Sequence, residues 1–411
     1  MKYGLIGEKL GHSFSKEIHG KLGRYEYELK ELAADELEAF IKGRDFEGIN
    51  VTIPYKEAVI PLLDDIDEAA GAIGAVNTIV NKNGRLTGYN TDAFGMMSML
   101  QMLGVDAEGK CVLIAGSGGT SKTAAYVAGK LGASEIKRIS RNPRGDAISY
   151  EEAYKRYGHA DILINTTPVG MFPNTDACPL DLSAFSRAEC VTDVVYNPLN
   201  TRLVQEARER GIAAEGGLYM LVAQAVRAAE LFTGDPVESG TTDLIYSELM
   251  MEKINIALIG MPGSGKTSIG RILAEKLERE FTDSDEEIIK EAGMDIAEIF
   301  ERYGEKYFRD LEAEVIKKIS LTGSKIIATG GGAVLRKENV EALRLNSVIV
   351  LLNRSLEELE PTSDRPLSDD IDKLRRLYEA RMPIYRETAD IITDPEGFDE
   401  PAAMEIWRSL L

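Results

Sequence analysis

The octapeptide Gly-Met-Pro-Gly-Ser-Gly-Lys-Thr at residues 260–267 constrains this chain more than any other segment, because it matches the phosphate-loop pattern GxxxxGK[ST]. An apolar run at 254–259 precedes it, and a helix-forming stretch at 268–278 follows it. This order predicts a strand, a phosphate-binding loop and a helix. The loop begins more than halfway along a chain of 411 residues. The sequence therefore predicts a second, separate unit ahead of it.

The predicted loop brings several kinds of phosphate ligand together. Backbone N–H groups of the glycine turn and of the helix N-terminus would surround the phosphates. Lys266 would reach the outermost phosphates, and the Thr267 hydroxyl would bind Mg²⁺. The residues expected to bind the nucleotide are Gly260, Gly263, Ser264, Gly265, Lys266, Thr267 and Ser268.

The composition excludes several classes of function. A net charge of −20 argues against nucleic-acid binding, which usually needs a basic surface. The three cysteines form no CxxC pair and the three histidines have no HExxH spacing, so the sequence predicts neither a zinc site nor a disulfide framework. The N-terminal residues include no apolar stretch long enough for a signal or a membrane span. We therefore expect a cytoplasmic protein without a membrane partner.

Segments resembling strands alternate with helical stretches along the whole chain, which predicts an α/β protein with parallel sheets covered by helices. The main boundary is expected at 250–253, where a helical run at 243–251 meets the first strand of the phosphate-loop unit. No linker rich in Gly or Ser lies there, so the join is expected to be short and semi-rigid. The expected strands are 3–6, 49–53, 111–115, 136–140, 162–165, 254–259, 326–329 and 348–352.

A second glycine turn lies in residues 111–128, between a strand and a helix that is expected to begin near Ser121. Its glycines are Gly116, Gly118 and Gly119. The turn is typical of dinucleotide binding, but GxGG departs from the GxGxxG form, and a purely structural turn is the alternative. The next strand ends at Ser140, Arg141 and Asn142. NAD-selective folds usually place an acidic residue there, so the cation Arg141 favours NADP with its 2′-phosphate.

Further motifs occur in order through the first half of the chain. Together they resemble shikimate dehydrogenase across residues 1 to about 250. The resemblance implies a substrate-binding and catalytic α/β domain at 1–92, completed by 218–250, and a Rossmann-like NADP-binding domain at 93–217. The motifs are GHSFSKEIH at 11–19, NVTIPYKEA at 50–58, GAVNTI at 74–79, YNTDAFG at 89–95, GSGGTSK at 116–122 and GGLYMLVAQA at 216–225.

The resemblance implies that Lys56 and Asp92 form the catalytic pair. Hydride delivery to a ketone creates an alkoxide, which needs a proton or a strong donor as it forms. An ammonium can donate, and a neighbouring carboxylate can orient it. Taken alone, Lys56 could instead begin a surface helix, and Asp92 could be the N-cap of a helix at 93–103.

The same resemblance implies the ligand-binding residues of this half. The substrate would contact Ser13, Ser15, Thr52, Asn77, Tyr196 and Gln224. The pyrophosphate of NADP(H) would contact Gly116, Gly118 and Gly119. Its 2′-phosphate end would contact Ser140, Arg141 and Asn142. Its nicotinamide would contact Gly217 and Met220. The chain departs from the family pattern at Lys16, where Pro is common, and at Tyr219, where Gly is common.

Motifs of the second half resemble shikimate kinase from residue 253 to 411, which implies a P-loop kinase domain with a parallel sheet. They are FTDSDEEI at 281–288, FRDLE at 308–312, GGG at 330–332, DRPLS at 364–368 and ARMPIY at 380–385. The chain departs from the family at Glu360-Pro361-Thr362, where an Arg often stacks on adenine, which puts the adenine contacts in doubt.

This second resemblance implies that Asp283, with Thr267, binds Mg²⁺ and that Asp285 acts on a substrate hydroxyl. We expect these two carboxylates to face the same side if their segment stays extended; alone, DxD is also a common surface feature. Arg365 would join Lys266 in neutralising the transferred phosphoryl group. The remaining substrate ligands would be Gly331 and Gly332 through their backbone, and Arg309 and Arg381 through bidentate contacts to a carboxylate.

Together the two resemblances imply a bifunctional enzyme. It would reduce 3-dehydroshikimate to shikimate with NADPH, and then phosphorylate shikimate to shikimate 3-phosphate with ATP and Mg²⁺. One alternative is a quinate/shikimate dehydrogenase joined to another small-molecule kinase. Another is a metabolite-sensing regulator without catalysis, against which the retained catalytic residues argue. The oligomeric state stays open.

Overall fold

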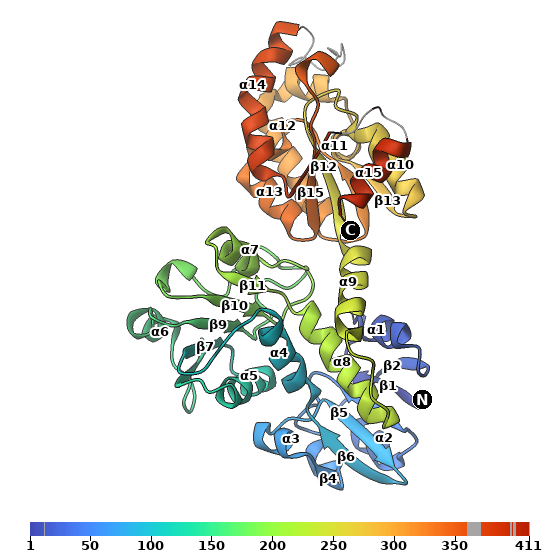
Figure 1. The fold of residues 1–411 in the computed structure, drawn as a ribbon, viewed down its shortest axis with the longest axis vertical. Helices are drawn as coiled ribbons and strands as arrows, with labels where there is room; N and C mark the ends of the chain where they lie inside the picture. Colours follow the sequence, from blue (N-terminus) through green and yellow to red (C-terminus); the bar gives the residue numbers. More distant parts are fainter. Residues whose placement is uncertain (12, 360–370, 395–396, 398–399, 411) are drawn as a thin grey trace. The chain divides into compact units, whose positions relative to one another are not determined.

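The structure is a computed structural model that describes all residues except 12, 360–370, 395–396, 398–399 and 411 (Figure 1). The chain divides into two compact units, Met1–Leu249 and Met250–Leu411. Helix α9, Thr241–Lys253, begins in the first unit and ends in the second. Among the described residues, no helix is long and apolar enough to cross a membrane.

The first unit contains a mixed sheet with the strand order β2-β1-β3-β5-β6-β4. Strands β2 and β3 run parallel to β1, whereas β5 is antiparallel to both β3 and β6. The strands are β1 (Tyr3–Gly7), β2 (Tyr27–Glu31), β3 (Gly48–Val51), β4 (Asp65–Ile66), β5 (Thr78–Lys82) and β6 (Arg85–Tyr89). The helical segments are α1 (Ser15–Leu22), α2 (Leu37–Gly43), the 3₁₀ turn Ile60–Leu62 and α3 (Glu68–Ile73).

The prediction of a purely parallel sheet is wrong for this part of the chain. Asn83 and Gly84 connect β5 to β6 and both have positive φ, at 55° and 81°. A two-residue turn with positive φ at both positions matches the twist of a β-hairpin, and Asn-Gly is the pair that favours it. This local turn therefore reverses the chain, so that β5 and β6 pair in antiparallel order.

The second sheet of the first unit is entirely parallel, with the order β11-β10-β9-β7-β8. The order reverses at β7, and in such sheets ligands bind beyond the carboxyl ends of the strands at that point. The strands are β7 (Cys111–Ala115), β8 (Glu135–Ile139), β9 (Ile162–Asn165), β10 (Cys190–Asp193) and β11 (Ala213–Glu215). The helices are α4 (Thr91–Met102), α5 (Gly119–Lys130), α6 (Tyr150–Arg156), the 3₁₀ turn Leu182–Ala184 and α7 (Arg202–Glu209).

Helix α8 (Leu218–Thr233) returns from the second sheet to the first and packs against α4. The two helices cross so closely that a Cβ on Gly95 would lie 2.5 Å from the Met220 carbonyl oxygen. Figure 1 shows α4 and α8 side by side between the two sheets of this unit. These helices therefore join the two halves of the unit next to the cleft.

The second unit has one parallel sheet with the order β13-β14-β12-β15-β16. Its strands are β12 (Asn255–Ile259), β13 (Glu280–Asp283), β14 (Lys325–Ala328), β15 (Ser347–Leu352) and β16 (Ile391–Thr393). Its helical segments are α10 (Lys266–Lys276), α11 (Ser284–Ala292), α12 (Ile296–Ser320), the 3₁₀ turn Ala333–Leu335, α13 (Lys337–Arg344), the 3₁₀ turn Leu356–Glu358, α14 (Ile371–Thr388) and α15 (Glu400–Arg408).

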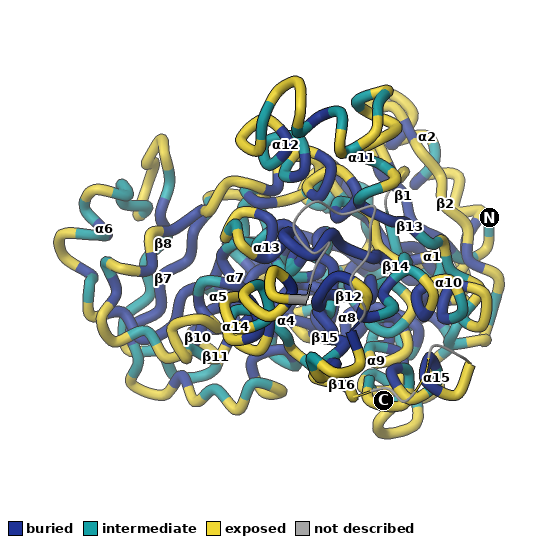
Figure 2. The backbone as a smooth tube through the Cα atoms, turned by 90° about the horizontal axis from the view of Figure 1, so that it is seen from above, coloured by how far each residue is buried: buried dark blue, intermediate teal, exposed yellow. Residues whose placement is uncertain are grey.

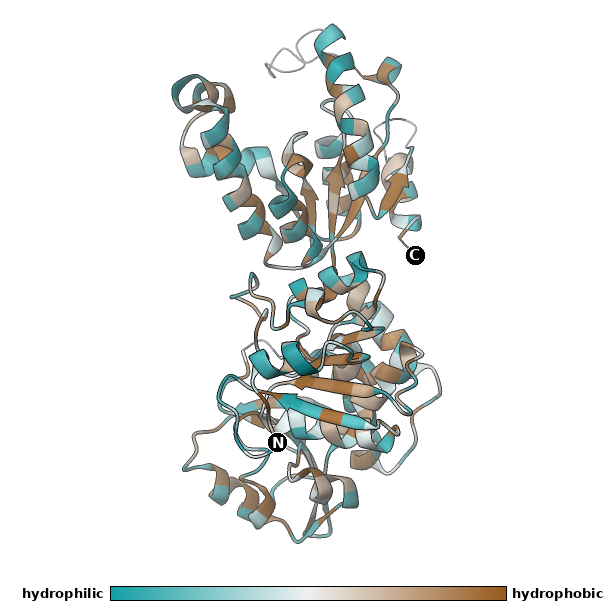
Figure 3. Ribbon diagram, turned by 90° about the vertical axis from the view of Figure 1, so that its left-hand side faces the viewer, coloured by the Kyte–Doolittle hydropathy of each residue, from teal (hydrophilic) through white to brown (hydrophobic). Residues whose placement is uncertain are grey.

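Both parallel sheets are covered on both faces, so their central strands have no exposed side. All residues of β7 and of β12 are buried (Figure 2). In the second unit one apolar cluster packs β12 against α10 and α15, and another packs it against α12, α13 and α14. The central strands β7 and β12 accordingly are mostly apolar, and central strands of both parallel sheets are brown in Figure 3, as expected for sheets buried on both faces.

Candidate functional sites

The catalytic pair that the resemblance implied for the first half lies in contact. Lys56 Nζ donates a hydrogen bond to Asp92 Oδ2 at 2.6 Å, and Asp92 Oδ1 accepts one from Asn77 Nδ2 at 2.8 Å. Lys56 lies in the turns that follow β3, not in a helix, and Asp92 lies in the first turn of α4. The side chains of Lys56 and Asp92 are only 19% and 12% exposed, so the pair is shielded from bulk water but still reachable.

The alternative role of Asp92 as a helix N-cap is wrong. Asn90 is the N-cap of α4, and its side-chain oxygen accepts a hydrogen bond from the Ala93 N–H at 3.1 Å. This leaves the Asp92 carboxylate free of any capping role, so that it can bind Lys56 and Asn77.

A buried network of polar side chains supports the pair. The Tyr27 hydroxyl donates to Asn50 Oδ1 at 2.7 Å, and Asn50 Nδ2 donates to Thr78 Oγ1 at 3.0 Å. Asn77 Oδ1 accepts from the Thr91 N–H at 2.7 Å. The sequence interpretation missed the supporting residues Tyr27, Asn50, Thr78 and Thr91. Polar residues inside otherwise apolar strands, such as Asn50 in β3, were the available signal, since a buried polar group needs a partner.

A cavity of about 370 Å³ opens in front of the pair. Its size and polar lining suit a small polyhydroxy acid. Ser13 and Ser15 meet at one end, with their hydroxyl oxygens 3.0 Å apart. All the substrate residues implied for the first half line it: Ser13, Ser15, Thr52, Asn77, Tyr196 and Gln224, together with Lys56 and Asp92.

A larger and more open cavity of about 1530 Å³ lies at the carboxyl ends of β7 and β8. Helix α5 begins at Gly119 with Gly118 as its N-cap, so the prediction of a start near Ser121 was two residues late. Backbone N–H groups at such a helix start can bind a phosphate. The implied cofactor residues that line this cavity are Gly116, Gly118, Gly119, Ser140, Arg141 and Asn142.

Two further arginines, Arg138 and Arg144, line the same cavity as Arg141. Arg138 forms an ion pair with Asp146. The sequence interpretation missed both arginines, although Arg144 lies only three residues after Arg141. Three arginines in its lining make the cavity suited to a phosphate group.

The two cavities meet at Lys56, which lines both. Gly217 and Met220, the implied nicotinamide contacts, line the smaller cavity on the side of α8. The amine of the catalytic pair therefore lies where a cofactor in one cavity would meet a substrate in the other.

Tyr219, at the position where the family often has Gly, attaches α9 to this site. Its hydroxyl donates to Asp243 Oδ1 at 2.8 Å, and its ring packs edge-on against Tyr246 with ring centroids 5.2 Å apart. Tyr246 in turn donates to Glu215 Oε1 at 3.0 Å. The departure from the family pattern is thus explained by contacts that hold α9 against the segment leading into α8.

The phosphate loop of the second unit lies between β12 and α10, as predicted, although α10 spans 266–276, two residues earlier than the predicted 268–278. Gly260, Gly263 and Gly265 have φ values of 145°, 79° and 92°, a region that favours glycine. Lys266 is buried, and its Nζ donates to the carbonyl oxygens of Gly260 at 3.0 Å and Met261 at 2.8 Å. The loop therefore wraps around the lysine; Ser264 lies in the loop, and Thr267 and Ser268 lie in the first turn of α10.

The oxygen donors implied for Mg²⁺ are adjacent. Thr267 Oγ1 donates to Asp283 Oδ2 at 2.8 Å. A hydroxyl and a carboxylate are the hard oxygen ligands that Mg²⁺ prefers, so the residues present fit that ion.

Asp283 and Asp285 were expected to face the same side only if their segment stayed extended, and the segment does not stay extended. The strand β13 ends at Asp283, whose Oδ1 caps α11 by accepting the Asp285 N–H at 2.9 Å. Asp285 therefore lies in the first helical turn. Its carboxylate still faces the triple glycine, because a Cβ on Gly330 would lie 2.6 Å from Asp285 Oδ1.

Both arginines implied to bind the substrate carboxylate contact the triple-glycine segment 330–332. Arg381 Nη1 donates to the Gly331 carbonyl oxygen at 3.0 Å, and the Arg309 guanidinium packs directly against Gly332. Arg309 also pairs with the buried Glu312, at 2.7 Å between Nη1 and Oε2. Arg365 and the segment Glu360-Pro361-Thr362 lie outside the described residues.

Glu312 is a site residue that the sequence interpretation missed, although it is the last residue of the FRDLE motif. Its side chain is fully buried, and burial raises the pKa of its carboxyl while the Arg309 guanidinium opposes that rise. Its Oε1 has no hydrogen-bond partner among the described residues. The glutamate therefore holds Arg309 in place while the guanidinium packs against Gly332.

Comparison with known proteins places both units in families. The family model of the shikimate dehydrogenase substrate binding domain matches residues 5–79, and the shikimate kinase family model matches residues 262–410. Shikimate dehydrogenase (NADP(+)) of Clostridium perfringens (strain SM101 / Type A) is 38% identical over 264 residues, which cover 60% of this chain and 97% of the relative. The Bacillus cereus (strain G9842) enzyme of the same description is 34% identical, covering 61% and 98%.

Solved structures also place the first unit in the shikimate dehydrogenase family. Shikimate dehydrogenase 1 from Peptoclostridium difficile has a TM-score of 0.56 at 37% identity, covering 61% of this chain and 99% of that one. Shikimate 5-dehydrogenase from Thermus thermophilus, in complex with NADP(H) and shikimate, has a TM-score of 0.55 at 30% identity, covering 60% and 99%. The chain thus belongs to the shikimate dehydrogenase family in its first unit and carries a shikimate kinase domain in its second, which makes it a bifunctional enzyme of the shikimate pathway.

Proposed function

We propose that the first unit reduces 3-dehydroshikimate to shikimate with NADPH, and that the second transfers a phosphoryl group from ATP to the shikimate 3-hydroxyl. The observation that carries the first half of this proposal is the position of Lys56, which pairs with Asp92 at 2.6 Å and lines both cavities. Each reaction has its own set of catalytic residues, so neither unit depends on the other for a catalytic group.

In the dehydrogenase site Lys56 donates the proton. NADPH, when bound, supplies the hydride that reduces the ketone carbon. The carbonyl oxygen then carries the electron pair of the broken C=O π bond, and the Lys56 ammonium gives it a proton. Asp92 orients the ammonium, while Asn77 holds the other oxygen of that carboxylate.

The remaining groups of the first unit hold the two ligands. Ser13 and Ser15 bind the substrate carboxylate, and Thr52, Asn77, Tyr196 and Gln224 bind its carboxylate or hydroxyls. Arg141 binds the 2′-phosphate, with Arg138 and Arg144 beside it in the lining of the cavity. The start of α5 at Gly118 and Gly119 binds the pyrophosphate through backbone N–H groups.

In the kinase site the protein supplies positioning and positive charge, which are the main needs of phosphoryl transfer. Lys266 and the loop N–H groups bind the phosphates. Arg365 joins Lys266 in neutralising the charge of the transferred phosphoryl group. Thr267 and Asp283 would hold Mg²⁺, which neutralises phosphate charge when bound. Asp285 accepts the proton of the attacking hydroxyl, and Arg309 and Arg381 bind the carboxylate against the backbone of Gly331 and Gly332.

One experiment tests both halves of the proposal. The purified chain is given 3-dehydroshikimate, NADPH, ATP and Mg²⁺, and the reaction is followed by NADPH absorbance and by the mass of the product. We expect NADPH oxidation and a phosphorylated product, with unphosphorylated shikimate accumulating when ATP is left out. NADPH oxidation without phosphorylation would favour a kinase of different specificity, and binding of both substrates without turnover would favour a metabolite sensor.

The compartment follows from the proposed chemistry. NADPH and ATP are both plentiful in the cytoplasm, and we place the enzyme there. Its partners would be its small-molecule substrates.

A further inference from the structure

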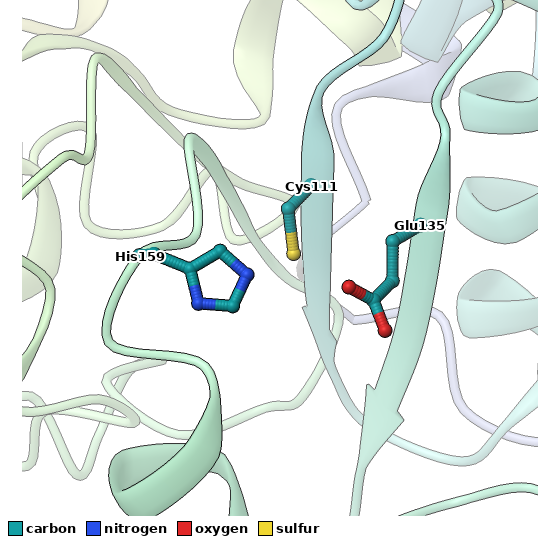
Figure 4. Close-up of side chains that lie close together, drawn as sticks. All are labelled: Cys111, Glu135 and His159. Atoms are coloured by element: carbon teal, nitrogen blue, oxygen red, sulfur yellow. The ribbon is translucent and has the colours of Figure 1, made fainter.

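Three side chains with metal-binding groups meet at the edge of the second sheet. Cys111 is the first residue of β7, Glu135 is the first residue of β8, and His159 lies in the connection between α6 and β9. The Cys111 sulfur, a Glu135 carboxylate oxygen and a His159 ring nitrogen all lie within 4.8 Å of one another. Figure 4 shows the thiol between the imidazole and the carboxylate, with all three directed toward one another.

The cluster is separate from both catalytic sites. Strands β7 and β8 pair in parallel with Cys111 opposite Glu135, so both residues lie at the amino ends of their strands. The cofactor cavity lies at the other ends of the same strands, next to Gly116 and Ser140. A ligand bound at the cluster would therefore not compete with either substrate.

The three groups are available for a new ligand. Among the described residues, neither the Cys111 thiol, the Glu135 carboxylate nor the His159 nitrogens make a hydrogen bond or an ion pair; the imidazole only stacks near Tyr157. The Cys111 side chain is buried, Glu135 is half-buried and His159 is exposed. The buried thiol can therefore stay in place while the two outer groups adjust.

The local charge also favours a cation. Besides Glu135, the Asp161 carboxylate lies next to Cys111, since its Oδ2 accepts the Cys111 N–H at 2.9 Å. Arg187 pairs with the other oxygen of Asp161 at 3.0 Å and offsets part of that negative charge. A cation bound between the thiol and Glu135 would be attracted by that carboxylate and would displace the thiol proton.

We propose that Cys111, Glu135 and His159 bind a divalent transition-metal cation of the zinc class. Sulfur and imidazole ligands select such ions, whereas Mg²⁺ and Ca²⁺ prefer oxygen ligands alone. In a tetrahedral zinc site the ligand atoms lie about 3.3–3.8 Å apart, so closure needs shifts of about 1 Å in the side chains of Glu135 and His159. Water would complete the coordination.

The bound ion would tie the connection at His159 to the starts of β7 and β8. Because it would bind the folded unit and not the unfolded chain, it would stabilise the first unit in proportion to metal concentration. The prediction from sequence that the chain has no zinc site rested on local spacing. The three ligands are too far apart in sequence for any such pattern to detect them.

Cobalt(II) tests the proposal without depending on enzyme activity. The metal-stripped full chain is titrated with Co²⁺ in excess Mg²⁺, which occupies oxygen-ligand sites such as the one at Thr267 and Asp283. We expect about one equivalent to give a thiolate-to-cobalt absorption band in the near ultraviolet, and Zn²⁺ to abolish it. Cys111→Ser should remove the band, whereas Cys178→Ser, the matched control at another thiol, should keep it. Absence of the band from the wild type, or its survival in Cys111→Ser, would overturn the proposal.

The other two ligands are tested by affinity. His159→Ala and Glu135→Gln should each weaken Co²⁺ binding by about tenfold or more, while Glu151→Gln, on the exposed face of α6, should leave it unchanged. Circular dichroism and the melting temperature of each metal-free variant show whether it is folded. A folded His159→Ala variant that binds Co²⁺ as tightly as the wild type would remove the imidazole from the site and contradict the proposal.

Discussion

The amines of Lys56 in the first unit and Lys266 in the second both donate to oxygen atoms, but these oxygens come from different sources. Lys56 pairs with the Asp92 carboxylate, which lies on another element of the fold. Lys266 donates to carbonyl oxygens of its own loop, at Gly260 and Met261. The first amine is therefore positioned by tertiary contacts, and the second by the local course of the backbone.

This difference explains why the two sites differ in how easily a sequence reveals them. A site built from one loop can be recognised from eight consecutive residues, because the glycines and the lysine all lie there. A site built from residues as distant as Tyr27, Asn50, Asn77 and Asp92 needs several motifs before it can be recognised. The comparison also predicts that changes in either site should leave the other unit working.

Lys266→Ala should have the largest effect. Phosphoryl transfer should fall by about three powers of ten or more, because the main fixed cation at the transferred phosphate is lost. Ketone reduction should stay near the wild-type rate. Separate steady-state assays of the two reactions measure this, and a parallel loss of both activities would break the picture of two independent sites.

Lys56→Ala should produce the converse pattern. Ketone reduction should fall by about two to three powers of ten, since the donor to the developing alkoxide is lost, while phosphorylation of added shikimate continues. The same pair of assays checks the result. A variant that kept full reductase activity would show that Lys56 is not the proton donor.

The buried Asp193 should make the first unit sensitive to pH. Burial raises the pKa of Asp193 from 3.8 to about 6, although Asn165, Thr201 and the Val195 N–H donate to its carboxylate. Its protonated form is thus favoured in the fold, so its contribution to stability is present below about pH 4 and is lost as the pH rises through about 6. The Asp193→Asn variant should not show this loss. Between pH 4 and pH 7 the unfolding free energy of the wild type should therefore fall by about 3 kcal/mol relative to that of the variant.

The measurement compares the unfolding free energies of wild type and Asp193→Asn across this pH range. The difference between the two chains is needed because burial lowers the pKa of His19 to about 3. The lowered pKa of His19 makes the folded state more stable as the pH rises, which is opposite to the effect of Asp193. The unfolding free energy of the wild type alone would therefore contain both effects. A difference that does not change between pH 4 and pH 7 would contradict the raised pKa of Asp193.

Arg141→Ala should change the choice of cofactor. The KM for NADPH should rise by about tenfold or more, because a charge-assisted contact to the 2′-phosphate is lost, and the KM for NADH should change little. Arg138 and Arg144 line the same cavity and should keep part of the preference. A wild-type enzyme that is equally efficient with both cofactors would refute the role given to Arg141.

Tyr219→Phe should have the smallest effect. It removes one hydrogen bond, to Asp243, and keeps the ring contact with Tyr246, so we expect a loss of about 1 kcal/mol in the stability of the first unit. The KM for NADPH should change by less than about threefold. Thermal unfolding and steady-state kinetics measure both, with Tyr246→Phe as the matched control. A large rise in KM would show that α9 controls the nicotinamide site more strongly than one hydrogen bond allows.

Much of the fold was predictable because parallel strands buried on both faces are continuous apolar runs. The predicted bounds of β7 and β9 agree with the structure, and those of β12 and β15 differ by one residue at their starts. The mixed sheet was not predicted, because β2 is mostly polar and exposed and β6 has only two buried residues. The hairpin between β5 and β6 depends on two residues, Asn83 and Gly84, whose signal was overlooked.

The sequence by itself determined the α/β class and the phosphate loop, because these depend on local patterns of apolar residues, glycines and charges. Most of the other candidate site residues were implied by the resemblance of several motifs to two families. Only the tertiary structure decided which of those residues touch. It brought Lys56 to Asp92 across 36 positions and Thr267 to Asp283 across 16. It also gathered Cys111, Glu135 and His159 into one cluster. Such contacts arise from strand order and helix packing, which bring together residues that no local spacing relates.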